Sequence, residues 1–210
     1  MPDTPETGQP PVNFDPSRIA VFLSGSGRTL VNIHRAIARG ELDAEIVDVV
    51  ASRPCLGLER AQALGLPTQI VDRPFSPDAL LDRVRTKSIG LIALAGYLSL
   101  IPVPRELERR ILNIHPALLP GDGTGGRFGG TGLYGARVHR AVLEAGETES
   151  GCTVHYCTEA YDAGPVILRK TCPVLPGDSP DSLAARVFER ELEAYPEALQ
   201  LAIDEHRTTS

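Results

Sequence analysis

An asparagine and a histidine, Asn113 and His115, stand two residues apart where a short apolar run gives way to a long glycine-rich segment. Side chains two apart on an extended strand point to the same face, so we expect the amide and the imidazole side by side. An amide can donate a hydrogen bond to a developing oxyanion, and an imidazole can transfer a proton near neutral pH. Taken alone, however, the pair favours a structural interpretation, in which a histidine at a strand end bonds a neighbouring backbone group.

A second candidate site is the loop 24–29, which follows an apolar run and precedes a helical pattern. Gly25 and Gly27 let the backbone approach a ligand closely, and the start of the helix supplies unpaired N–H groups and a positive dipole end. We therefore predict a monophosphate cradle. The loop is not a dinucleotide fingerprint, because Leu30 occupies the third glycine position, and it lacks the Gly-Lys-Ser/Thr of a Walker A loop. The alternative is a tight turn that needs glycine for geometry only.

The elements that must position these residues alternate between strand and helix. Unbroken apolar runs are typical of strands covered on both faces, and segments with helical spacing separate them. We expect strands at 18–23, 44–51, 68–71, 89–95 and 111–114, and helices at 29–39, 58–64 and 77–86. This alternation predicts an α/β fold with a doubly wound, mostly parallel, Rossmann-like sheet.

The pattern changes after the fifth strand. Residues 121–135 hold eight glycines and are expected to form no regular element. Beyond them the sequence predicts a helix at 136–145, an antiparallel extension of strands 152–157 and 166–174, and a long terminal helix at 179–203 with Ser179 as its N-cap. Residues 1–16 are rich in proline and poor in apolar side chains, so we expect a disordered leader before a single domain at 17–205.

Composition excludes several classes of function. The formal net charge is −6 with no basic cluster, which argues against a nucleic-acid surface. No apolar run approaches the roughly 18 residues of a membrane span, and the N-terminal segment has no signal-peptide pattern. The four cysteines show no CxxC pair, which is typical of reduced thiols rather than a zinc site. We expect a cytoplasmic enzyme of small molecules; the sequence does not indicate an oligomeric state.

Seven separated segments resemble the folate-dependent formyltransferases in order and spacing, and within them the branch that formylates glycinamide ribonucleotide. The segments are Ser24-Gly25-Ser26-Gly27, Gly57-Leu58-Glu59-Arg60-Ala61, Leu94-Ala95-Gly96-Tyr97, Asn113-Ile114-His115-Pro116-Ala117-Leu118-Leu119-Pro120, Gly132-Leu133-Tyr134-Gly135, Ser150-Gly151-Cys152-Thr153-Val154-His155 and Tyr161-Asp162-Ala163-Gly164-Pro165. Together they extend over nearly the whole chain, from about residue 18 to 203.

The resemblance implies transfer of the formyl group of 10-formyltetrahydrofolate, a co-substrate, to the amine of glycinamide ribonucleotide in purine synthesis, without a metal. It implies that Asn113, His115 and Asp162 form the catalytic trio. It implies that the acceptor phosphate and ribose contact Gly25, Ser26, Gly27, Arg28, Thr29 and Glu191. It implies that folate contacts Arg60, Tyr97, Leu98, Ser99, Leu100, Ile101, Cys157, Thr158, Glu159, Ala160 and Tyr161.

Several of these residues have plainer alternatives. Asp162, beside glycine and proline, could be a turn former. Arg60 could be a solvated helix arginine, and Glu191 a helix-surface acid. His155 lies in an alternating strand, where a packed structural histidine is expected, and His139 could lie near the substrate or on a solvated helix face.

The chain departs from the family pattern at two places. Arg28 follows the glycine loop where relatives commonly carry asparagine, and it could add a bidentate phosphate contact. Residues 121–126 are inserted after Pro120, and Thr131 stands at a position where relatives often carry lysine. Six residues, mostly glycine, predict a mobile flap over the site, with Arg127 supplying the missing cation.

Two other functions remain open. The acceptor could be another amine, such as an amino-sugar nucleotide, because the departures lie on the acceptor side. The chain could also be a folate-binding module without catalysis. Against the second alternative stands the presence of all three residues of the trio, which a pure binding module does not need.

Overall fold

The computed structural model describes residues 14–71 and 75–208. Most of the leader predicted for residues 1–16 therefore lies outside the described residues. The strands are β1 (Asp15–Leu23), β2 (Glu45–Ala51), β3 (Thr68–Ile70), β4 (Ile89–Leu94), β5 (Ile111–His115), β6 (Glu149–Tyr156) and β7 (Val166–Pro173). The helices are α1 (Arg28–Ala38), α2 (Leu56–Ala63), α3 (Pro77–Lys87), α4 (Ala136–Glu144) and α5 (Pro180–Thr208), with one 3₁₀ turn, η1 (Arg105–Leu107).

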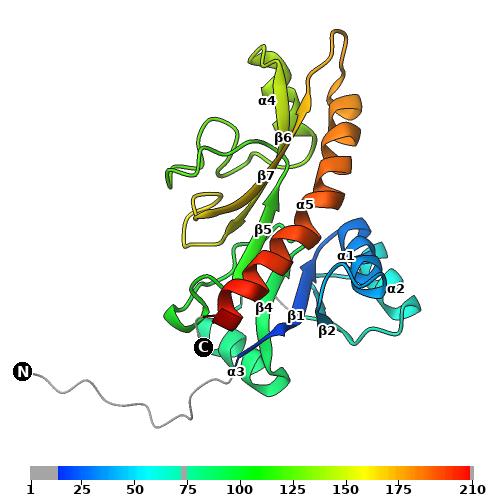
Figure 1. Cartoon of the computed structure of the whole chain (residues 1–210), viewed down its shortest axis with the longest axis vertical. Coiled ribbons are helices and arrows are strands. Elements are labelled where there is room, and N and C mark those ends of the chain that lie inside the picture. The colour runs from blue at the N-terminus through cyan, green and yellow to red at the C-terminus, as the bar shows by residue number, and fades with distance from the viewer. Residues whose placement is uncertain (1–13, 72–74, 209–210) are drawn as a thin grey trace, which may run out of the picture.

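All the strands join one seven-stranded sheet in the order β3-β2-β1-β4-β5-β6-β7 (Figure 1). The first five pair in parallel, β6 runs antiparallel to β5, and β7 runs antiparallel to β6. The predicted doubly wound sheet with an antiparallel extension is therefore confirmed. All six residues of β4 are buried, as expected for a central strand covered on both faces.

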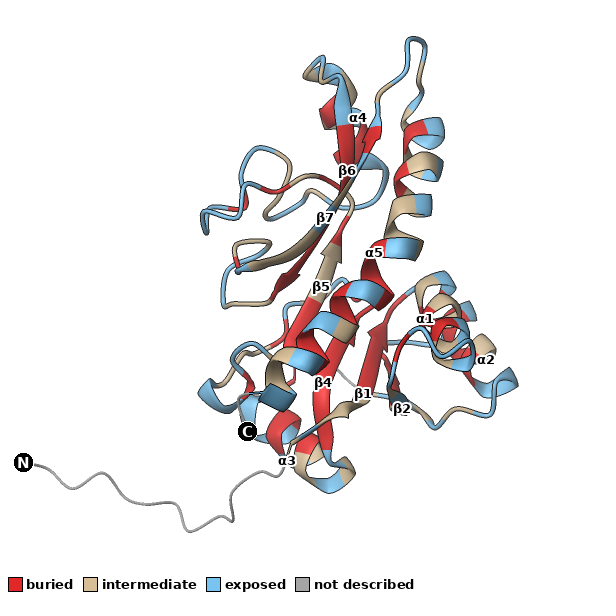
Figure 2. Ribbon diagram, in the orientation of Figure 1, coloured by how far each residue is buried: buried red, intermediate tan, exposed pale blue. Residues whose placement is uncertain are grey.

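Helices cover both faces of the sheet and create two apolar cores. Buried residues of α1, α2, α4 and α5 form one core with alternate residues of β1, among them Ile19 and Val21. Buried residues of α3 and η1 form the other core with Ala20 and Phe22. Figure 2 shows the buried residues concentrated along the central strands and on the inward sides of the helices.

The course of the chain fixes where a ligand can bind. The connection after β1 enters α1 on one face, whereas the connection after β4 packs its Tyr97, Ile101 and Leu107 into the core on the opposite face. Since β1 and β4 are neighbours, their carboxyl ends form the point where the connections diverge. Such a switch point is where open α/β sheets bind ligands.

The long helix α5 crosses the sheet and is tied to it by polar bonds (Figure 1). The buried Tyr195 hydroxyl lies 3.0 Å from the carbonyl oxygen of Leu94, at the end of β4, and 2.9 Å from that of Leu112, near the start of β5. Pro196 cannot donate to the carbonyl of Leu192 one turn earlier, and the Asn32 side chain of α1 donates to that carbonyl at 2.8 Å. The proline is thus accommodated inside the helix.

The structure differs from the sequence prediction mainly at element ends. β1 begins at Asp15 rather than at residue 18, and α5 continues to Thr208. The added last turn of α5 is held by tertiary bonds, since Glu205 accepts from the Tyr156 hydroxyl at 2.7 Å and binds the Arg109 guanidinium. The three residues of η1 were not predicted, because a single turn has no periodic pattern. Within the described residues, no helix has the length and apolar character needed to cross a membrane.

Candidate active site

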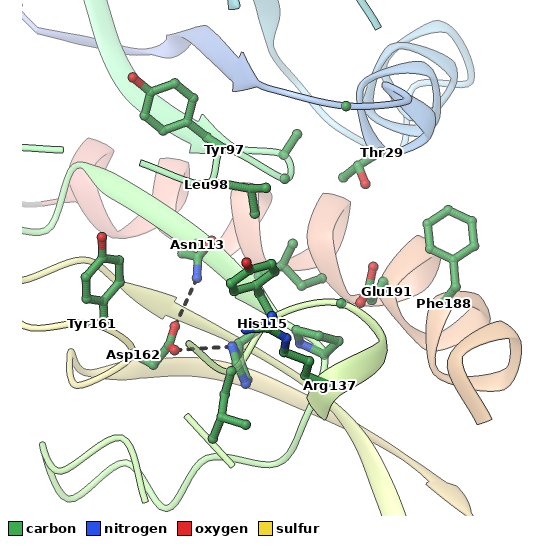
Figure 3. Close-up of a pocket in the computed structure, with 18 of the residues that line it drawn as sticks. Thr29, Tyr97, Leu98, Asn113, His115, Arg137, Tyr161, Asp162, Phe188 and Glu191 are labelled. Carbon is green, nitrogen blue, oxygen red and sulfur yellow. Dashed lines mark hydrogen bonds and ion pairs between the residues drawn. The ribbon is translucent and has the colours of Figure 1, made fainter. Parts of the chain in front are cut away.

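A cavity of about 620 Å³ opens at the carboxyl ends of β1, β4 and β5 (Figure 3). Its walls come from the loop after β1, the loop after β4, the end of β5, the segment before α4, the loop between β6 and β7, and α5. Segments that lie far apart in the sequence therefore meet around one space. The residues predicted for catalysis, and those predicted for the acceptor phosphate and ribose, all line it.

The predicted trio comes together in this cavity. Asn113 and His115 lie on β5, and Asp162 reaches them from the loop between β6 and β7 (Figure 3). The Asn113 amide donates to Asp162 Oδ1 at 3.4 Å, and His115 Nδ1 lies 3.4 Å from Asp162 Oδ2. The backbone N–H of Gly130 donates to Oδ2 at 2.9 Å. Asp162 is thus held between the amide and the imidazole rather than acting only as a turn former.

The surroundings of Asp162 stabilise its charged form. Burial, the largest influence, raises the pKa of this carboxyl, but hydrogen bonds from His115, His155 and the Gly130 backbone together hold the pKa well below its usual range. The residue also has a left-handed backbone, with φ of +55°. Aspartate adopts this conformation more readily than most residues. A carboxylate therefore faces the imidazole throughout the neutral pH range.

The two ring nitrogens of His115 each face an oxygen. Nε2 lies 2.7 Å from the carbonyl oxygen of Phe128, and Nδ1 faces Asp162. A neutral imidazole has one N–H and can donate to only one of these acceptors, whereas an imidazolium donates to both. The protein thus engages both ring nitrogens of His115.

The structure places a fourth side chain, His155, beside the trio. The sequence predicts it only as a packed residue of its strand. His155 is buried, as predicted, but β6 pairs it directly opposite Asn113. Its Nε2 lies 3.2 Å from the Asn113 amide nitrogen and 3.6 Å from Asp162 Oδ1. His155 Nδ1 donates to the Tyr156 carbonyl oxygen at 2.9 Å, so in the neutral ring Nε2 accepts from Asn113. The strand register is the signal that would have placed His155 in the site.

His139 lies at the first turns of α4 and is 4% exposed, so the solvated-face alternative is wrong. Burial lowers the pKa of His139, and the charge of His115 lowers it further. A neutral histidine is therefore packed close to the site. It does not line the cavity.

The acceptor side of the cavity combines a glycine loop, a helix start and charged groups. Residues 25–29 line it, and Gly27 caps α1 with φ of +72° and without a side-chain cap. The guanidinium of Arg28 lies 4.0 Å above the ring of Phe188. Burial raises the pKa of Glu191 to about 7, and the charges of Arg28 and His115 oppose that rise. Glu191 is thus a wall of the cavity and not a surface acid.

The residues predicted for folate lie mostly around an adjoining, smaller cavity of about 60 Å³. It shares Tyr97, Asn113, Tyr161 and Asp162 with the larger cavity. The other members of the folate group that line it are Ser99, Leu100, Ile101, Cys157, Thr158 and Ala160, whereas Leu98 lines the larger cavity. Burial raises the pKa of the Cys157 thiol to about 12, so this cysteine is a neutral wall residue. Of the trio, Asn113 and Asp162 line both cavities, whereas His115 lines only the larger one.

Two of the predicted folate contacts are not found at these cavities. Glu159 is exposed and lines neither cavity. Arg60 lines neither cavity because its guanidinium turns to the glycine loop, where Nη1 donates to the Ser26 carbonyl oxygen at 2.8 Å. The structure thus places Arg60 at the glycine loop, and its contact with folate stays a prediction.

The glycine-rich insertion also differs from its prediction. A β-carbon on Gly125 would lie 3.3 Å from the Tyr161 carbonyl oxygen, and one on Gly123 would lie 3.7 Å from that of Ala163. Residues 121–126 therefore lie against the backbone that carries Asp162, and none of them lines either cavity. The expectation of a flap over the site is wrong, because the insertion packs against the loop that carries Asp162, outside both cavities.

The cation expected from Arg127 is also found elsewhere. Arg127 lines neither cavity and pairs with Glu147 at 3.5 Å. Arg137 lines the large cavity instead, with its guanidinium 5.3 Å from the ring of Tyr134. Over the described ranges, no cluster of three or more His, Cys, Asp or Glu side chains is placed to hold a metal ion.

Comparison with known proteins agrees with this geometry. The family model described as formyl transferase matches residues 17–199. A chloroplastic phosphoribosylglycinamide formyltransferase of Arabidopsis thaliana is 38% identical over 90% of this chain and 66% of its own length. The phosphoribosylglycinamide formyltransferase of Haemophilus influenzae is 34% identical over 85% of this chain and 84% of its own length. The chain thus spans slightly less than two thirds of the Arabidopsis relative.

Solved structures give the same result. Glycinamide ribonucleotide transformylase 1 from Symbiobacterium toebii superposes with a TM-score of 0.78 at 35% identity, covering 90% of this chain and 88% of that one. A formyltetrahydrofolate deformylase from Pseudomonas syringae, 21% identical, shares the fold with a TM-score of 0.74 over 90% of this chain and 62% of that one. With a family match over most of its length and a site assembled on this fold, the chain belongs to the formyl transferase family.

Proposed function

We propose that the protein transfers the formyl group of 10-formyltetrahydrofolate to the amine of glycinamide ribonucleotide. The observation that carries the proposal is the place of Asn113, His115 and Asp162. Asn113 and Asp162 line both cavities and His115 lines the larger one; the larger cavity has an anion-binding loop, and the smaller one is lined largely by apolar groups. Relatives and structural neighbours named for this acceptor support the choice of amine.

The two cavities suit the two substrates in different ways. The loop 25–29 presents backbone N–H groups and the start of α1 to the acceptor phosphate, beside the Arg28 guanidinium. Glu191 can accept hydrogen bonds from ribose hydroxyls. Tyr97, Ile101 and Tyr161 offer apolar and aromatic surface to a pterin ring. This arrangement brings the acceptor amine and the formyl carbon together at the trio.

The proposed chemistry is acyl transfer through a tetrahedral intermediate. The acceptor amine attacks the formyl carbon, a carbon–nitrogen bond forms, and negative charge develops on the formyl oxygen. The Asn113 amide is one donor for that oxyanion, and a His115 imidazolium is a second donor if its Nε2 gives up the bond to the Phe128 carbonyl oxygen; one such donor is typically worth about 10²–10³ in rate. Since the Asn113 amide is engaged by Asp162 and His155 in this structure, donation to the substrate replaces its longer bond, the one of 3.4 Å to Asp162.

Collapse of the intermediate completes the transfer. The bond between the formyl carbon and the folate nitrogen breaks, the attacking amine loses one proton, and the departing nitrogen gains one. Asp162 can order a water that carries this proton, and its negative charge faces the His115 ring at 3.4 Å. Neither a covalent enzyme intermediate nor a metal ion is needed in this scheme, and a cytoplasmic location is proposed with it.

The test mixes purified protein with 10-formyltetrahydrofolate and follows folate release by absorbance, with and without glycinamide ribonucleotide. We expect release that depends on the amine, that yields one formylated product per folate, and that persists in a metal chelator. Release without the amine would replace the proposal by hydrolysis. No release, with the folate still bound, would replace the acceptor by another phosphorylated amine, such as an amino-sugar nucleotide.

A further inference from the structure

The glycine loop after β1 is bonded to the first turn of α2. The Gly57 backbone N–H donates to the Gly25 carbonyl oxygen at 2.9 Å, and Arg60 Nη1 donates to the Ser26 carbonyl oxygen at 2.8 Å. Two successive carbonyl groups of the loop are therefore held by one neighbouring helix. The loop and α2 also touch directly, because a β-carbon on Gly27 would overlap the Gly57 backbone.

These two bonds set the direction of the loop's N–H groups. A trans peptide is planar, and its C=O and N–H point in opposite directions. Since the carbonyls of Gly25 and Ser26 turn toward α2, the N–H groups of Ser26 and Gly27 turn away from α2. Residues 25–29 line the large cavity, and Arg60 does not. The N–H groups are thus directed to the side on which an anion would bind.

Besides these two bonds, the loop is held at its start, where Arg53 Nε donates to the Ser24 carbonyl oxygen at 3.4 Å; the peptide between Ser26 and Gly27 is held by Arg60. Glycine on both sides of Ser26 leaves the backbone free to rotate, and loss of that freedom disfavours the ordered loop. If the peptide between Ser26 and Gly27 turned over, it would place a carbonyl oxygen where an anion needs a donor. The bond from Arg60 opposes this reversal, and the arginine forms no ion pair of 4.0 Å or less with a carboxylate among the residues that the structure covers.

We propose that Arg60 is a positioning residue for phosphate binding: by holding the Ser26 carbonyl it keeps the Ser26 and Gly27 N–H groups directed at the phosphate of the acceptor. The inference rests on the proposed function, because that function supplies the phosphate. Arg60 acts through the loop and contacts neither substrate.

Titration calorimetry with ribose 5-phosphate tests the proposal without requiring turnover. We expect Arg60→Gln to weaken binding about tenfold, the effect of one hydrogen bond to a charged donor. Arg60→Lys keeps a charged donor and is expected to recover most of the affinity. Arg35→Gln removes the same charge from an exposed position on α1 that lines neither cavity, and is expected to bind ribose 5-phosphate like the wild type. Melting temperatures of all variants show whether each has folded.

Kinetics supply a second readout that general loss of structure would not reproduce. In Arg60→Gln the KM for glycinamide ribonucleotide should rise about tenfold, while kcat and the KM for 10-formyltetrahydrofolate stay unchanged. Unchanged ribose 5-phosphate binding in Arg60→Gln, an equal loss in Arg35→Gln, or no binding to the wild type would each overturn the proposal. Failure of the formyl transfer assay alone would overturn the proposed function and leave the Arg60 proposal supported by the calorimetry.

Discussion

Replacing Asp162 with asparagine removes one negative charge from the site and changes little else. The two side chains have nearly the same shape, and asparagine tolerates the left-handed backbone at φ of +55° as aspartate does. The amide oxygen can still accept from the Gly130 N–H, which now lies 2.9 Å from Oδ2. The variant therefore tests the charge facing His115 rather than the fold of the loop.

The expected loss of transition-state stabilisation follows from the distance between the Asp162 carboxylate and the His115 imidazole. His115 Nδ1 lies 3.4 Å from Asp162 Oδ2, and at an effective dielectric constant of about 20 unit charges at that distance attract by about 5 kcal/mol. Relaxation and water entry reduce this figure, so we take about 3–4 kcal/mol as the loss in transition-state stabilisation. Each 1.4 kcal/mol is tenfold in rate, so kcat should fall by about 10²–10³.

The assay is amine-dependent folate release, compared with the melting temperature of the same preparation. Asp48→Asn is the matched control. Asp48 lies on β2, is fully buried, pairs with Arg83 and Lys87 of α3, and lines neither cavity. That control should lose about 3 kcal/mol or more of stability, as broken buried pairs do, and keep its kcat at a temperature where it is folded. An Asp162→Asn variant that turns over within tenfold of the wild type would refute the electrostatic reasoning.

Three further outcomes follow from the same contacts. Glu191→Gln should stabilise the protein by about 1–3 kcal/mol at pH values above about 7, because the folded-state pKa of about 7 exceeds the ordinary 4.5 and the carboxyl must ionise while buried. This gain should shrink as the pH falls from about 7 to about 4.5, where the glutamate is protonated in both states; a gain that is constant with pH in thermal melts would contradict it. Asn32→Ala should cost about 1–3 kcal/mol in urea denaturation by leaving the Leu192 carbonyl unpaired, and the cost should largely vanish in a Pro196→Ala background, whose restored N–H reaches that carbonyl; equal costs in both backgrounds would exclude this explanation. Gly129→Ala should lower kcat while folate binding persists, because its β-carbon would lie 3.0 Å from that of Asp162 and would also overlap the Gly125 carbonyl; unchanged kinetics would show that close packing at residue 129 does not position Asp162.

The arrangement of the sheet could be predicted from the sequence because local patterns report it. The continuous apolar run of β4 is the signature of burial on both faces, and glycine or serine at the helix boundaries marked where elements change. The Ser179 side chain accepts from the Ser182 backbone at 3.1 Å, so the predicted N-cap of α5 is confirmed. The last turn of α5 could not be predicted, since its bonds to Tyr156 and Arg109 depend on distant strands.

Local sequence patterns also predicted part of the candidate site. The alternation of side chains on β5 placed Asn113 beside His115, and motif spacing indicated Asp162. His155 depended on the register between β5 and β6, which no local pattern reports. The side chain of Arg60 turns to the glycine loop, a direction that a motif on its helix does not report. Composition suggested that the 121–126 insertion would be mobile, whereas its position is set by contacts with residues 161–163.

The bonds that α5 makes have a consequence for the order in which the molecule folds. Asn32 and Leu192 are 160 residues apart, and Tyr195 is 101 and 83 residues from its two carbonyl partners. Contacts between residues so far apart in the sequence form late, because closing a long loop costs entropy. We therefore expect α5 to dock after the local strand–helix units have formed. Phe188 and Glu191 belong to this helix, and the acceptor side of the cavity therefore appears only with the final docking step. In refolding, recovery of ribose 5-phosphate binding should lag behind recovery of the helical circular-dichroism signal. Ligand binding would then report when the native state is complete.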